Sequence, residues 1–409
     1  MIKSIRLIDW KSYEDSILYI DPLTILIGTN SSGKSNVVDA LIFLSRISCG
    51  VGIYQAINGD VSVNSLRGGI DWVCRQGHDC FSLEVISEID SIEYEYYIKI
   101  KIEPAKALIY EEKLVRRGKR SVRLFCTNLR DEGLLNIPTY FWTGNQGKGQ
   151  NFELNRNTSV LFQSKSLQLK KKEIIGVVAG ISELLGGIFV LDPIPNHMRQ
   201  YSKLADGLEK DGSNIAGVLA ALNEEKRIKV ESILTSYLKK IPEKDIEKVW
   251  AECVGKFNTD AMLYCKEGWG SNEDCIVDAK GMSDGTLRFL AIITAMLTND
   301  RTKLIVIEEV DNGLHPSRAR NLLNMLIELG AQRNIDVVIT THNPALLDAA
   351  GTEMIPFITV AHRGSNGHSQ LTLLEDVNDL PKLISMGNIG ELATKGKIES
   401  ALARKDDSK

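Results

Sequence analysis

The stretch "ILIGTNSSGKSN", residues 25–36, decides the fold of this chain. Its first three residues end the apolar run 23–27, which predicts a buried strand. The rest of the stretch contains the pattern G-x-x-x-x-G-K-[ST]. Glycines at 28 and 33 allow the loop to turn so that consecutive backbone N–H groups point inward, and a helix beginning near Lys34 adds its positive dipole end. The flanking strand and helix therefore favour a phosphate-binding loop over a chance turn rich in glycine and serine.

The polar residues of this loop have distinct expected roles. Lys34 is expected to reach the β- and γ-phosphates of a nucleotide, and the Ser35 hydroxyl is expected to hold Mg²⁺. The residues expected to bind the nucleotide within this loop are Gly28, Asn30, Ser31, Gly33, Lys34 and Ser35. A nucleoside triphosphate with Mg²⁺ is therefore the expected ligand.

Composition limits the classes of protein to which the chain can belong. It has 409 residues, of which 43% are hydrophobic and 25% charged, enough for one large or two modest domains. A net charge of −4 provides no overall basic field that would favour nucleic acid. Seven cysteines include no C-x-x-C pair, so reduced thiols and no zinc site are expected. The charged, alternating start and the lack of a long apolar run predict a cytoplasmic protein without a membrane span.

The pattern of apolar residues divides the chain into four expected segments. Residues 1–80 begin the nucleotide-binding core with strands at 2–8, 16–19 and 23–27 and a helix at 34–47. Residues 81–159 form a β-rich subdomain, with antiparallel strands expected at 81–89, 93–102, 107–117 and 120–126. Residues 160–277 form a helical lobe, with helices expected at 174–185, 213–222 and 226–238. Residues 278–409 complete the core, with helices expected at 285–297 and 317–329 and strands at 304–307 and 336–340.

A second motif, "KLIVIEEVDNGLHP" at residues 303–316, places two acids after four apolar residues. A buried parallel strand that ends in adjacent acids can direct one to the water shell of a metal and the other to the attacking water. Glu308 is therefore expected to orient Mg²⁺, and Glu309 is expected to position or deprotonate the water. Two surface acids at a strand end are the alternative.

Two further motifs follow the same logic. In "DVVITTHNPALLD", an apolar strand leads to His342, whose imidazole can bond the γ-phosphate or the water. In "GMSDGTLRFLAIITAML", Ser283 and Gly285 lie at the start of a helix and can form a second anion site. The first loop already accommodates one triphosphate, so this second site suggests closure over the nucleotide of a second copy. A serine N-cap without a ligand is the alternative.

The ordered set "GTNSSGKS", "MSDGT", "LIVIEEVDNGLHP" and "TTHNP" resembles the ABC-type ATPases of the branch that contains the RecF, SMC and OLD-like proteins. The resemblance implies an α/β fold, namely a P-loop ABC-type ATPase head with an inserted antiparallel β subdomain and a helical lobe. It also implies ATP as the nucleotide, with Lys34 and Ser35 in Walker A. Glu308 then corresponds to the Walker B metal position, Glu309 to the catalytic glutamate and His342 to the switch histidine.

By the same resemblance, Ser283 and Gly285 form a signature motif that acts in trans across a dimer holding two ATP molecules. The chain departs from the usual pattern in three places. Glu308 stands where Walker B usually has Asp, and Asp284 and Thr286 stand where transporters have Gly and Gln. An acid next to a triphosphate is unfavourable unless its side chain points away. Gln163 is a weak candidate for the Q-loop glutamine.

Several functions of such ATPases are not expected here. A transporter would need a membrane span or a coupling helix, a structural-maintenance protein would need a long coiled-coil arm, and too few residues follow His342 for a nuclease domain of ~100 residues. A nucleotide-dependent switch is therefore predicted, with a homodimer or higher homo-oligomer holding ATP at its interface. By family analogy it would control a separately encoded effector, a nuclease or toxin, in bacterial anti-phage defence.

The alternative is a RecF-like DNA-binding ATPase in DNA repair. Its support is a basic hairpin at residues 113–123, "KLVRRGKRSVR", which could lie along phosphates. The cations of this hairpin are Lys113, Arg116, Arg117, Lys119, Arg120 and Arg123. A solvated hairpin turn is the alternative interpretation, since two glutamates adjoin it and no aromatic residue interleaves the charges.

Overall fold

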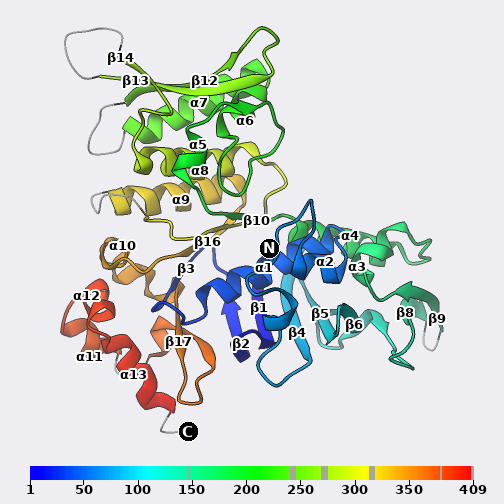
Figure 1. Ribbon diagram of the computed structural model, residues 1–409. Coiled ribbons are helices and arrows are strands. Elements are labelled where there is room, and N and C mark those ends of the chain that lie inside the picture. The colour runs from blue at the N-terminus through cyan, green and yellow to red at the C-terminus, as the bar shows by residue number, and fades with distance from the viewer. Residues whose placement is uncertain (146–147, 240–245, 269–274, 313–317, 378–379, 407–409) are drawn as a thin grey trace. The chain divides into compact units, whose positions relative to one another are not determined.

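The computed structural model describes residues 1–145, 148–239, 246–268, 275–312, 318–377 and 380–406. The chain forms two compact units, and each combines helices with strands, which confirms the expected α/β class (Figure 1). The first unit contains Met1–Ile188, Thr359–Asn378 and Glu399–Lys409, and the second contains Phe189–Ile358 and Asp379–Ile398. The phosphate-loop sequence falls in the first unit, and the acidic strand falls in the second.

The strand that enters the phosphate loop is flanked by a hairpin from much later in the chain. The order of strands in this part of the first unit is β3, β17, β18, β2 and β1. Their bounds are Leu23–Ile27, Ile358–Arg363, Ser369–Leu373, Tyr13–Tyr19 and Ile2–Trp10. Strands β1 and β2 pair antiparallel, as do β17 and β18, whereas β18 pairs with β2 in parallel. Every residue of β3 is buried, as expected for a strand covered on both faces.

The expected β-rich subdomain continues the same sheet from β1 (Figure 1). Its strands are β4 (Cys80–Ile89), β5 (Ile92–Glu103), β6 (Lys106–Arg116), β7 (Val122–Thr127), β8 (Asn136–Asn145) and β9 (Lys148–Asn155). Neighbouring strands pair antiparallel, which confirms the four strands predicted from alternation. In β5, alternate residues from Tyr94 to Ile100 are buried, so one face of the strand packs into the core. Strands β8 and β9 were not predicted and extend the sheet beyond the four expected strands.

The helices of the first unit are α1 (Lys34–Ser48), α2 (Ile53–Asn58), α3 (Val160–Gln163) and α4 (Lys172–Gly186), with single turns η1 (Gly69–Trp72) and η2 (Ser164–Ser166). Helix α1 packs against the sheet through an aromatic cluster of Trp10, Phe43 and Phe81. The ring centroids of Trp10 and Phe81 lie 4.8 Å apart in an edge-on contact. The Trp10 indole also donates to the Asn36 carbonyl at 2.7 Å, which fixes the first turn of α1 to β1.

The second unit contains a short parallel sheet in the order β10 (Ile188–Leu191), β15 (Leu304–Ile307) and β16 (Asp336–Thr340). Ile305 pairs with Val337 in a parallel register. All four residues of β15 are buried, because a central parallel strand is covered on both faces. The predicted strands at 304–307 and 336–340 are confirmed.

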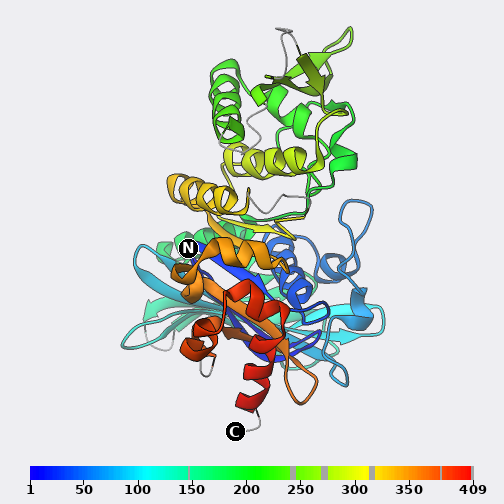
Figure 2. The same ribbon diagram turned by 90° about the vertical axis from the view of Figure 1, so that its left-hand side faces the viewer.

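Helix α8 forms the buried centre of the second unit, where it contacts α5, α6, α7 and α9 (Figure 2). The helices of this unit are α5 (Pro195–Met198), α6 (Ile215–Ala221), α7 (Glu224–Lys239), α8 (Asp284–Thr298), α9 (Ala319–Arg333), α10 (Pro344–Ala350), α11 (Leu380–Ser385) and α12 (Ile389–Thr394). The turn η4 covers Thr352–Phe357 in the second unit, whereas η5 (Leu374–Asp376) and most of α13 (Lys397–Asp406) belong to the first unit. The predicted first residue of α9, Ser317, lies outside the described residues. No helix in the described parts of the chain is long and apolar enough to cross a membrane.

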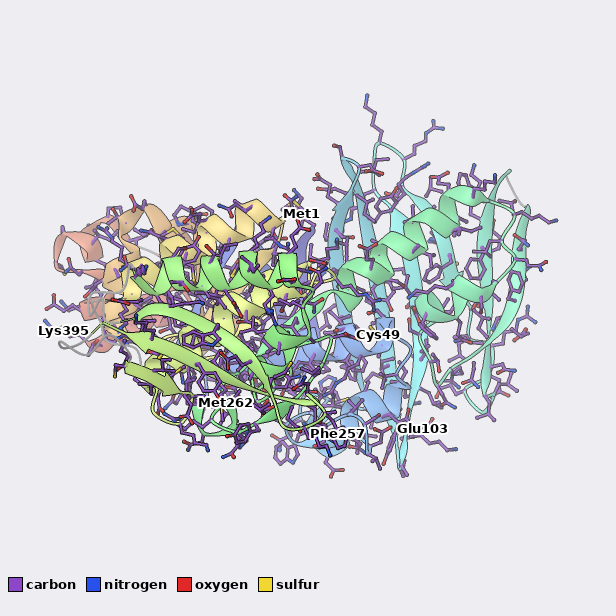
Figure 3. The ribbon with its side chains drawn as sticks, turned by 90° about the horizontal axis from the view of Figure 1, so that it is seen from above. Met1, Cys49, Glu103, Phe257, Met262 and Lys395 are labelled. Carbon is purple, nitrogen blue, oxygen red and sulfur yellow. The ribbon has the colours of Figure 1, made fainter. Side chains whose placement is uncertain are left out.

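A small antiparallel sheet lies in the segment expected to be a helical lobe. It contains β11 (Ser202–Lys203), β12 (Ile246–Val254), β13 (Asp260–Glu267) and β14 (Cys275–Asp278). Helices α6 and α7 contact β12. Phe257 lies in the turn between β12 and β13, and Met262 lies on β13 (Figure 3). The strands escaped prediction because β12 buries only Val249 and Ala251, so its alternation is weak.

Candidate functional site

The phosphate loop requires glycine at two positions. Gly28 has φ +147°, and a Cβ there would lie 2.2 Å from the Ala361 carbonyl oxygen on β17. Gly33 has φ +114°, and a Cβ there would lie 2.7 Å from both the Ser369 hydroxyl and the Tyr13 hydroxyl. Real side chains do not tolerate such contacts. Only glycine therefore allows the chain to turn between β3 and α1 in this way.

The Lys34 side chain folds back over the loop. Its ammonium group donates to the Gly28 carbonyl at 2.5 Å and to the Thr29 carbonyl at 3.1 Å. In the described residues no side chain caps the N-terminus of α1. The positive end of the helix and the Lys34 ammonium therefore meet at the loop, which is the arrangement that binds phosphate.

The remaining loop residues present polar groups at the surface. Asn30, Ser31 and Ser35 are exposed, and the Arg363 guanidinium on β17 donates to the Ser31 carbonyl at 3.2 Å. The glycine cradle, the cation and the exposed Ser35 hydroxyl together fit a polyphosphate with its metal ion. Sequence reasoning did not identify Arg363, which belongs to a hairpin far along the chain.

The acidic motif lies at the end of β15, as predicted. The backbone N–H of Glu308 donates to the Leu191 carbonyl on β10 at 3.0 Å, which anchors this residue to the sheet. Its side chain is largely buried, and one carboxylate oxygen lies 3.6 Å from the Lys210 ammonium. A carboxylate that is held at a sheet edge in this way can orient a metal-bound water. Lys210 was not identified from the sequence, because nothing in its neighbourhood forms a motif.

Glu309 adopts a strained backbone conformation that sets its side chain apart from that of Glu308. Its φ is +45°, a region that residues other than glycine rarely adopt. The N–H of Glu309 donates to the Thr340 hydroxyl at 2.9 Å, and its carboxylate accepts a hydrogen bond from the Asn312 amide at 2.8 Å. The carboxylate is about half exposed. It is therefore positioned by neighbours and still open to water.

His342 lies beside Glu309. Its Nδ1 is 4.0 Å from a Glu309 carboxylate oxygen, and the imidazole is about half exposed. The structure thus brings Glu308, Glu309 and His342 to one edge of the second unit's parallel sheet. An acid and an imidazole at this separation can share a water molecule or pass a proton.

Ser283 caps helix α8. Its hydroxyl accepts from the Thr286 N–H at 3.2 Å, and Gly285 is buried in the first turn. The Asp284 carboxylate accepts a hydrogen bond from Arg199 at 2.7 Å, and Arg199 also donates to the Met282 carbonyl. This ion pair neutralises the acid next to Ser283, which answers the electrostatic difficulty raised by the sequence.

Gln163 has a structural role in the first unit. Its side-chain amide donates to the Asn155 and Thr158 carbonyls and accepts from the Asn155 N–H at 3.0 Å. All of these contacts stabilise the turn before α3. The hydrogen bonds account for Gln163 without a nucleotide.

The basic hairpin at 113–123 is partly neutralised by acids. Lys113 and Arg117 both pair with Glu95, at 3.2 and 2.9 Å, and Arg116 pairs with Glu173. Lys119, Arg120 and Arg123 are exposed in the same hairpin. Half of the cations that favoured nucleic acid are therefore held within the protein.

Comparisons with known proteins support a nucleotide-binding chain. A protein-family model described as "AAA domain, putative AbiEii toxin, Type IV TA system" matches residues 23–348, a range that includes the phosphate loop and the acidic motif. An "ATP/GTP phosphatase" of Helicobacter pylori (strain ATCC 700392 / 26695) is 38% identical over 68 residues. This match covers 16% of the chain and 18% of that relative, so it spans less than a fifth of the relative's length.

A solved structure shows the fold. The structure described as "the SmcHead bound to the C-winged helix domain of ScpA" aligns with a TM-score of 0.52 over 91% of this chain and 97% of that chain. The sequences are 13% identical, so the likeness concerns the fold alone. It confirms the expected ATPase-head fold.

Proposed function

This chain belongs to the AAA-domain family described as putative AbiEii toxins of type IV toxin–antitoxin systems, which makes it an ABC/AAA-type ATPase, and we propose that it acts as a nucleotide-dependent switch. In this proposal ATP is bound with Mg²⁺ and hydrolysed, and the bound state is read by a separate effector. The observation that carries the proposal is the Glu309 carboxylate, which extends from a strained backbone, is held by Asn312 and lies beside His342. A carboxylate fixed in this way can act on an attacking water.

The residues of the phosphate loop bind the nucleotide in this proposal. Lys34 exchanges the Gly28 and Thr29 carbonyls for the β- and γ-phosphate oxygens, and the α1 N-terminus faces the same charge. We assign Ser35 and Glu308 as the candidate residues for Mg²⁺, which when bound would neutralise part of the phosphate charge. The assignments within the loop require no change in its backbone, because the loop already has the conformation that only glycine permits.

The acidic motif carries out the chemistry. Glu309 accepts a proton from the attacking water, or orients the water so that a phosphate oxygen accepts it. His342 donates a hydrogen bond to the γ-phosphate or to the same water. Asn312 keeps the Glu309 carboxylate in place through the amide hydrogen bond. Removing the Glu309 charge should therefore stop turnover without preventing nucleotide binding.

The switch requires a second copy of the chain. Ser283 is exposed at the start of α8, and the neighbouring Asp284 is neutralised by Arg199, so this helix end can approach a phosphate. We assign Ser283 and Gly285 to the ATP of a partner copy. The family description supports an effector of the toxin type, and the role in anti-phage defence rests on that family analogy.

DNA binding of the RecF type has less support. Three of the hairpin cations are in ion pairs with Glu95 and Glu173. Phosphate binding through Lys113, Arg116 and Arg117 would require these pairs to break. Without them, only Lys119, Arg120 and Arg123 are left in the hairpin to contact DNA phosphates.

The switch is tested by the mass of Glu309→Gln in solution, measured by light scattering with and without Mg-ATP. We expect a mass increase in Mg-ATP, because ATP that is not hydrolysed keeps the copies together. The double variant Lys34→Ala, Glu309→Gln is the control and should show no increase. A monomer under both conditions would refute the trans role of Ser283. A constant larger species would show a permanent assembly in place of an ATP-driven one.

A further inference from the structure

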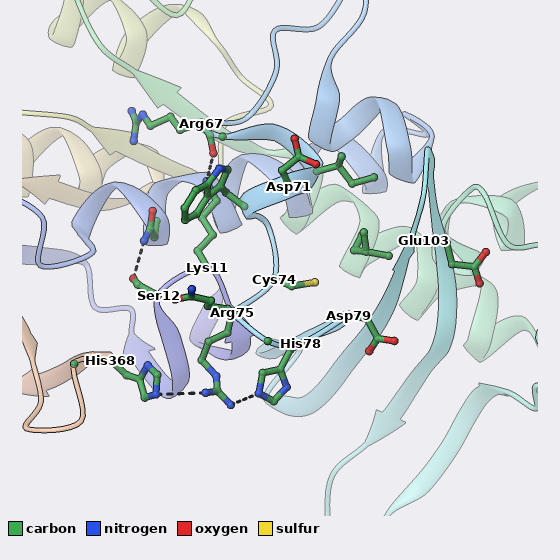
Figure 4. Close-up of a pocket in the computed structure, with 18 of the residues that line it drawn as sticks. Lys11, Ser12, Arg67, Asp71, Cys74, Arg75, His78, Asp79, Glu103 and His368 are labelled. Atoms are coloured by element: carbon green, nitrogen blue, oxygen red, sulfur yellow. Dashed lines mark hydrogen bonds between the residues drawn. The ribbon is translucent and has the colours of Figure 1, made fainter.

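A large pocket lies in the first unit next to the residues that follow the phosphate loop. Its volume is about 1160 Å³, and its walls come from the β1–β2 turn, the start of α1, residues 67–79, the β5–β6 turn and the β17–β18 hairpin. Figure 4 shows Lys11, Ser12 and Arg67 on one side and Asp79 and Glu103 on another. Small-molecule sites are typically about 300–1,000 Å³, so the space is sufficient for a nucleoside.

Hydrogen bonds connect the walls of this pocket to the phosphate loop and its helix. Arg67 donates to the Ser35 carbonyl at 3.2 Å, and Arg363 donates to the Ser31 carbonyl at 3.2 Å. The Asn36 amide donates to the Ser12 hydroxyl at 2.7 Å. A ligand whose phosphates occupy the loop therefore has the pocket directly beside it.

Trp72 gives the pocket an exposed aromatic surface. Its side chain belongs to the pocket lining, and the residue is 69% exposed. Gly68, with φ +81°, approaches it so closely that a Cβ there would lie 2.7 Å from the Trp72 Cβ. An exposed indole in a pocket that cations also line can stack on a planar ring, and base stacking is tolerant of base identity.

One wall of the pocket is fixed by a network of contacts around Arg75. Its guanidinium contacts His78 Nε2 at 2.6 Å and His368 Nε2 at 3.4 Å (Figure 4). It also donates to the Asp9 carboxylate at 2.7 Å. An Arg75 guanidinium nitrogen also lies 3.8 Å from a Glu14 carboxylate oxygen, so residues from four chain segments hold Arg75. The wall is formed before any ligand arrives, as small-molecule sites usually are.

We propose that this pocket receives the base and ribose of the bound nucleotide, with Trp72 stacked on the base and Arg67 next to the phosphate that adjoins the ribose. The proposal rests on the proposed ATPase function and adds residues that no sequence motif marks. Trp72 then contributes to affinity for the nucleoside and makes no contribution to hydrolysis. The phosphate loop would bind the β- and γ-phosphates.

The experiment compares ATP with inorganic tripolyphosphate, which has the phosphates and no nucleoside. For Trp72→Ala we expect the KM for ATP to rise roughly tenfold with kcat within about twofold, a change typical of losing one stacked base. Trp72→Phe should retain most of the affinity. Inhibition by tripolyphosphate should be equal in Trp72→Ala and in the unaltered chain. Phe257→Ala removes an exposed aromatic from the second unit and should change none of these values.

Two outcomes distinguish this proposal from the ATPase proposal. An unchanged KM for ATP in Trp72→Ala would overturn the nucleoside pocket and leave the phosphate loop intact. Binding of tripolyphosphate to Lys34→Ala with unchanged affinity, measured by titration calorimetry, would instead overturn the phosphate-loop assignment. As a second readout, ATP should change the tryptophan fluorescence of the unaltered chain and of Trp250→Phe, and should change it far less in Trp72→Phe. An equal change in all three would also contradict the proposal.

Discussion

The phosphate loop of the first unit and the acidic edge of the second unit are built in different ways. The loop depends on main-chain geometry, because Gly28 and Gly33 have no room for a Cβ. The acidic edge depends on side chains that β15 and β16 present, with Glu309 held by Asn312 and Thr340. The difference suggests that affinity for the nucleotide and the rate of its hydrolysis are separable properties. Changes to Lys34 in the first unit should remove binding, and changes to Glu309 in the second should remove turnover alone.

The largest effect is expected from Lys34→Ala. The Lys34 ammonium is the cation folded over the loop, and without it the phosphates lose a charge-assisted partner. We expect ATP affinity to fall by about a hundredfold or more, which corresponds to the loss of two or more charged hydrogen bonds. Titration calorimetry measures the affinity, and Lys106→Ala, at the exposed first residue of β6, is the control. Near-normal affinity in Lys34→Ala would remove the first unit from nucleotide binding.

Glu309→Gln should give the opposite pattern. The amide keeps the size of the side chain and cannot accept a proton, so kcat should fall by roughly a hundredfold to a thousandfold while ATP affinity stays within about threefold. Phosphate release and calorimetry measure the two quantities. Glu353→Gln, an exposed acid in the turn after α10, is the matched control and should behave as the unaltered chain does. Full turnover in Glu309→Gln would exclude this residue from catalysis.

A smaller effect is expected from Asn312, which positions Glu309 through the amide hydrogen bond. Asn312→Ala should lower kcat roughly tenfold, because one hydrogen bond to a charged group is lost. Asn312→Asp provides a sharper test. A second carboxylate beside Glu309 should repel the Glu309 carboxylate and displace it, so kcat should fall further than in Asn312→Ala. A kcat in both variants equal to that of the unaltered chain would show that Asn312 has no part in positioning.

The smallest effect on turnover is expected from Glu112, which lies in the first unit and outside the loop. This carboxyl is fully buried and accepts hydrogen bonds from Tyr96, Ser159 and the N–H groups of Val160 and Leu161. Burial raises its pKa to about 7. Between about pH 4.3, where an unfolded glutamate titrates, and pH 7, the folded chain retains a proton that the unfolded chain releases. Stability should therefore fall as pH rises through this window.

Glu112→Gln removes that titration. The apparent melting temperature of the unaltered chain should decrease from pH 5 to pH 7.5 relative to that of Glu112→Gln, with turnover at a fixed pH within about twofold. Scanning fluorimetry at several pH values measures the difference. Parallel pH dependences for the two proteins would show that Glu112 keeps its ordinary pKa.

The sequence predicted those parts of the fold and site that depend on local pattern. The G-x-x-x-x-G-K-S spacing placed the loop between β3 and α1, and the apolar run before Glu308 placed β15. Alternation identified β4 to β7. The position of His342 directly after an apolar strand also predicted that it lies at the sheet edge, where Glu309 is found.

The parts that could not be predicted depend on contacts between distant segments. Lys210 approaches Glu308, and Arg199 neutralises Asp284, yet neither cation lies in a motif. Arg363 contacts the phosphate loop from a hairpin more than three hundred residues later. The small sheet of β11 to β14 was missed because half-buried strands show weak alternation. Such features follow from tertiary packing, and no local pattern records them.

The central claim is that the first unit binds ATP and that Glu309 in the second unit hydrolyses it. The most direct measurement is the identity of the nucleotide that remains bound after each variant is incubated with labelled Mg-ATP and passed rapidly over a desalting column. We predict intact ATP on Glu309→Gln, ADP or no nucleotide on the unaltered chain, and no nucleotide on Lys34→Ala. ADP on Glu309→Gln, or ATP retained by Lys34→Ala, would contradict this division of roles.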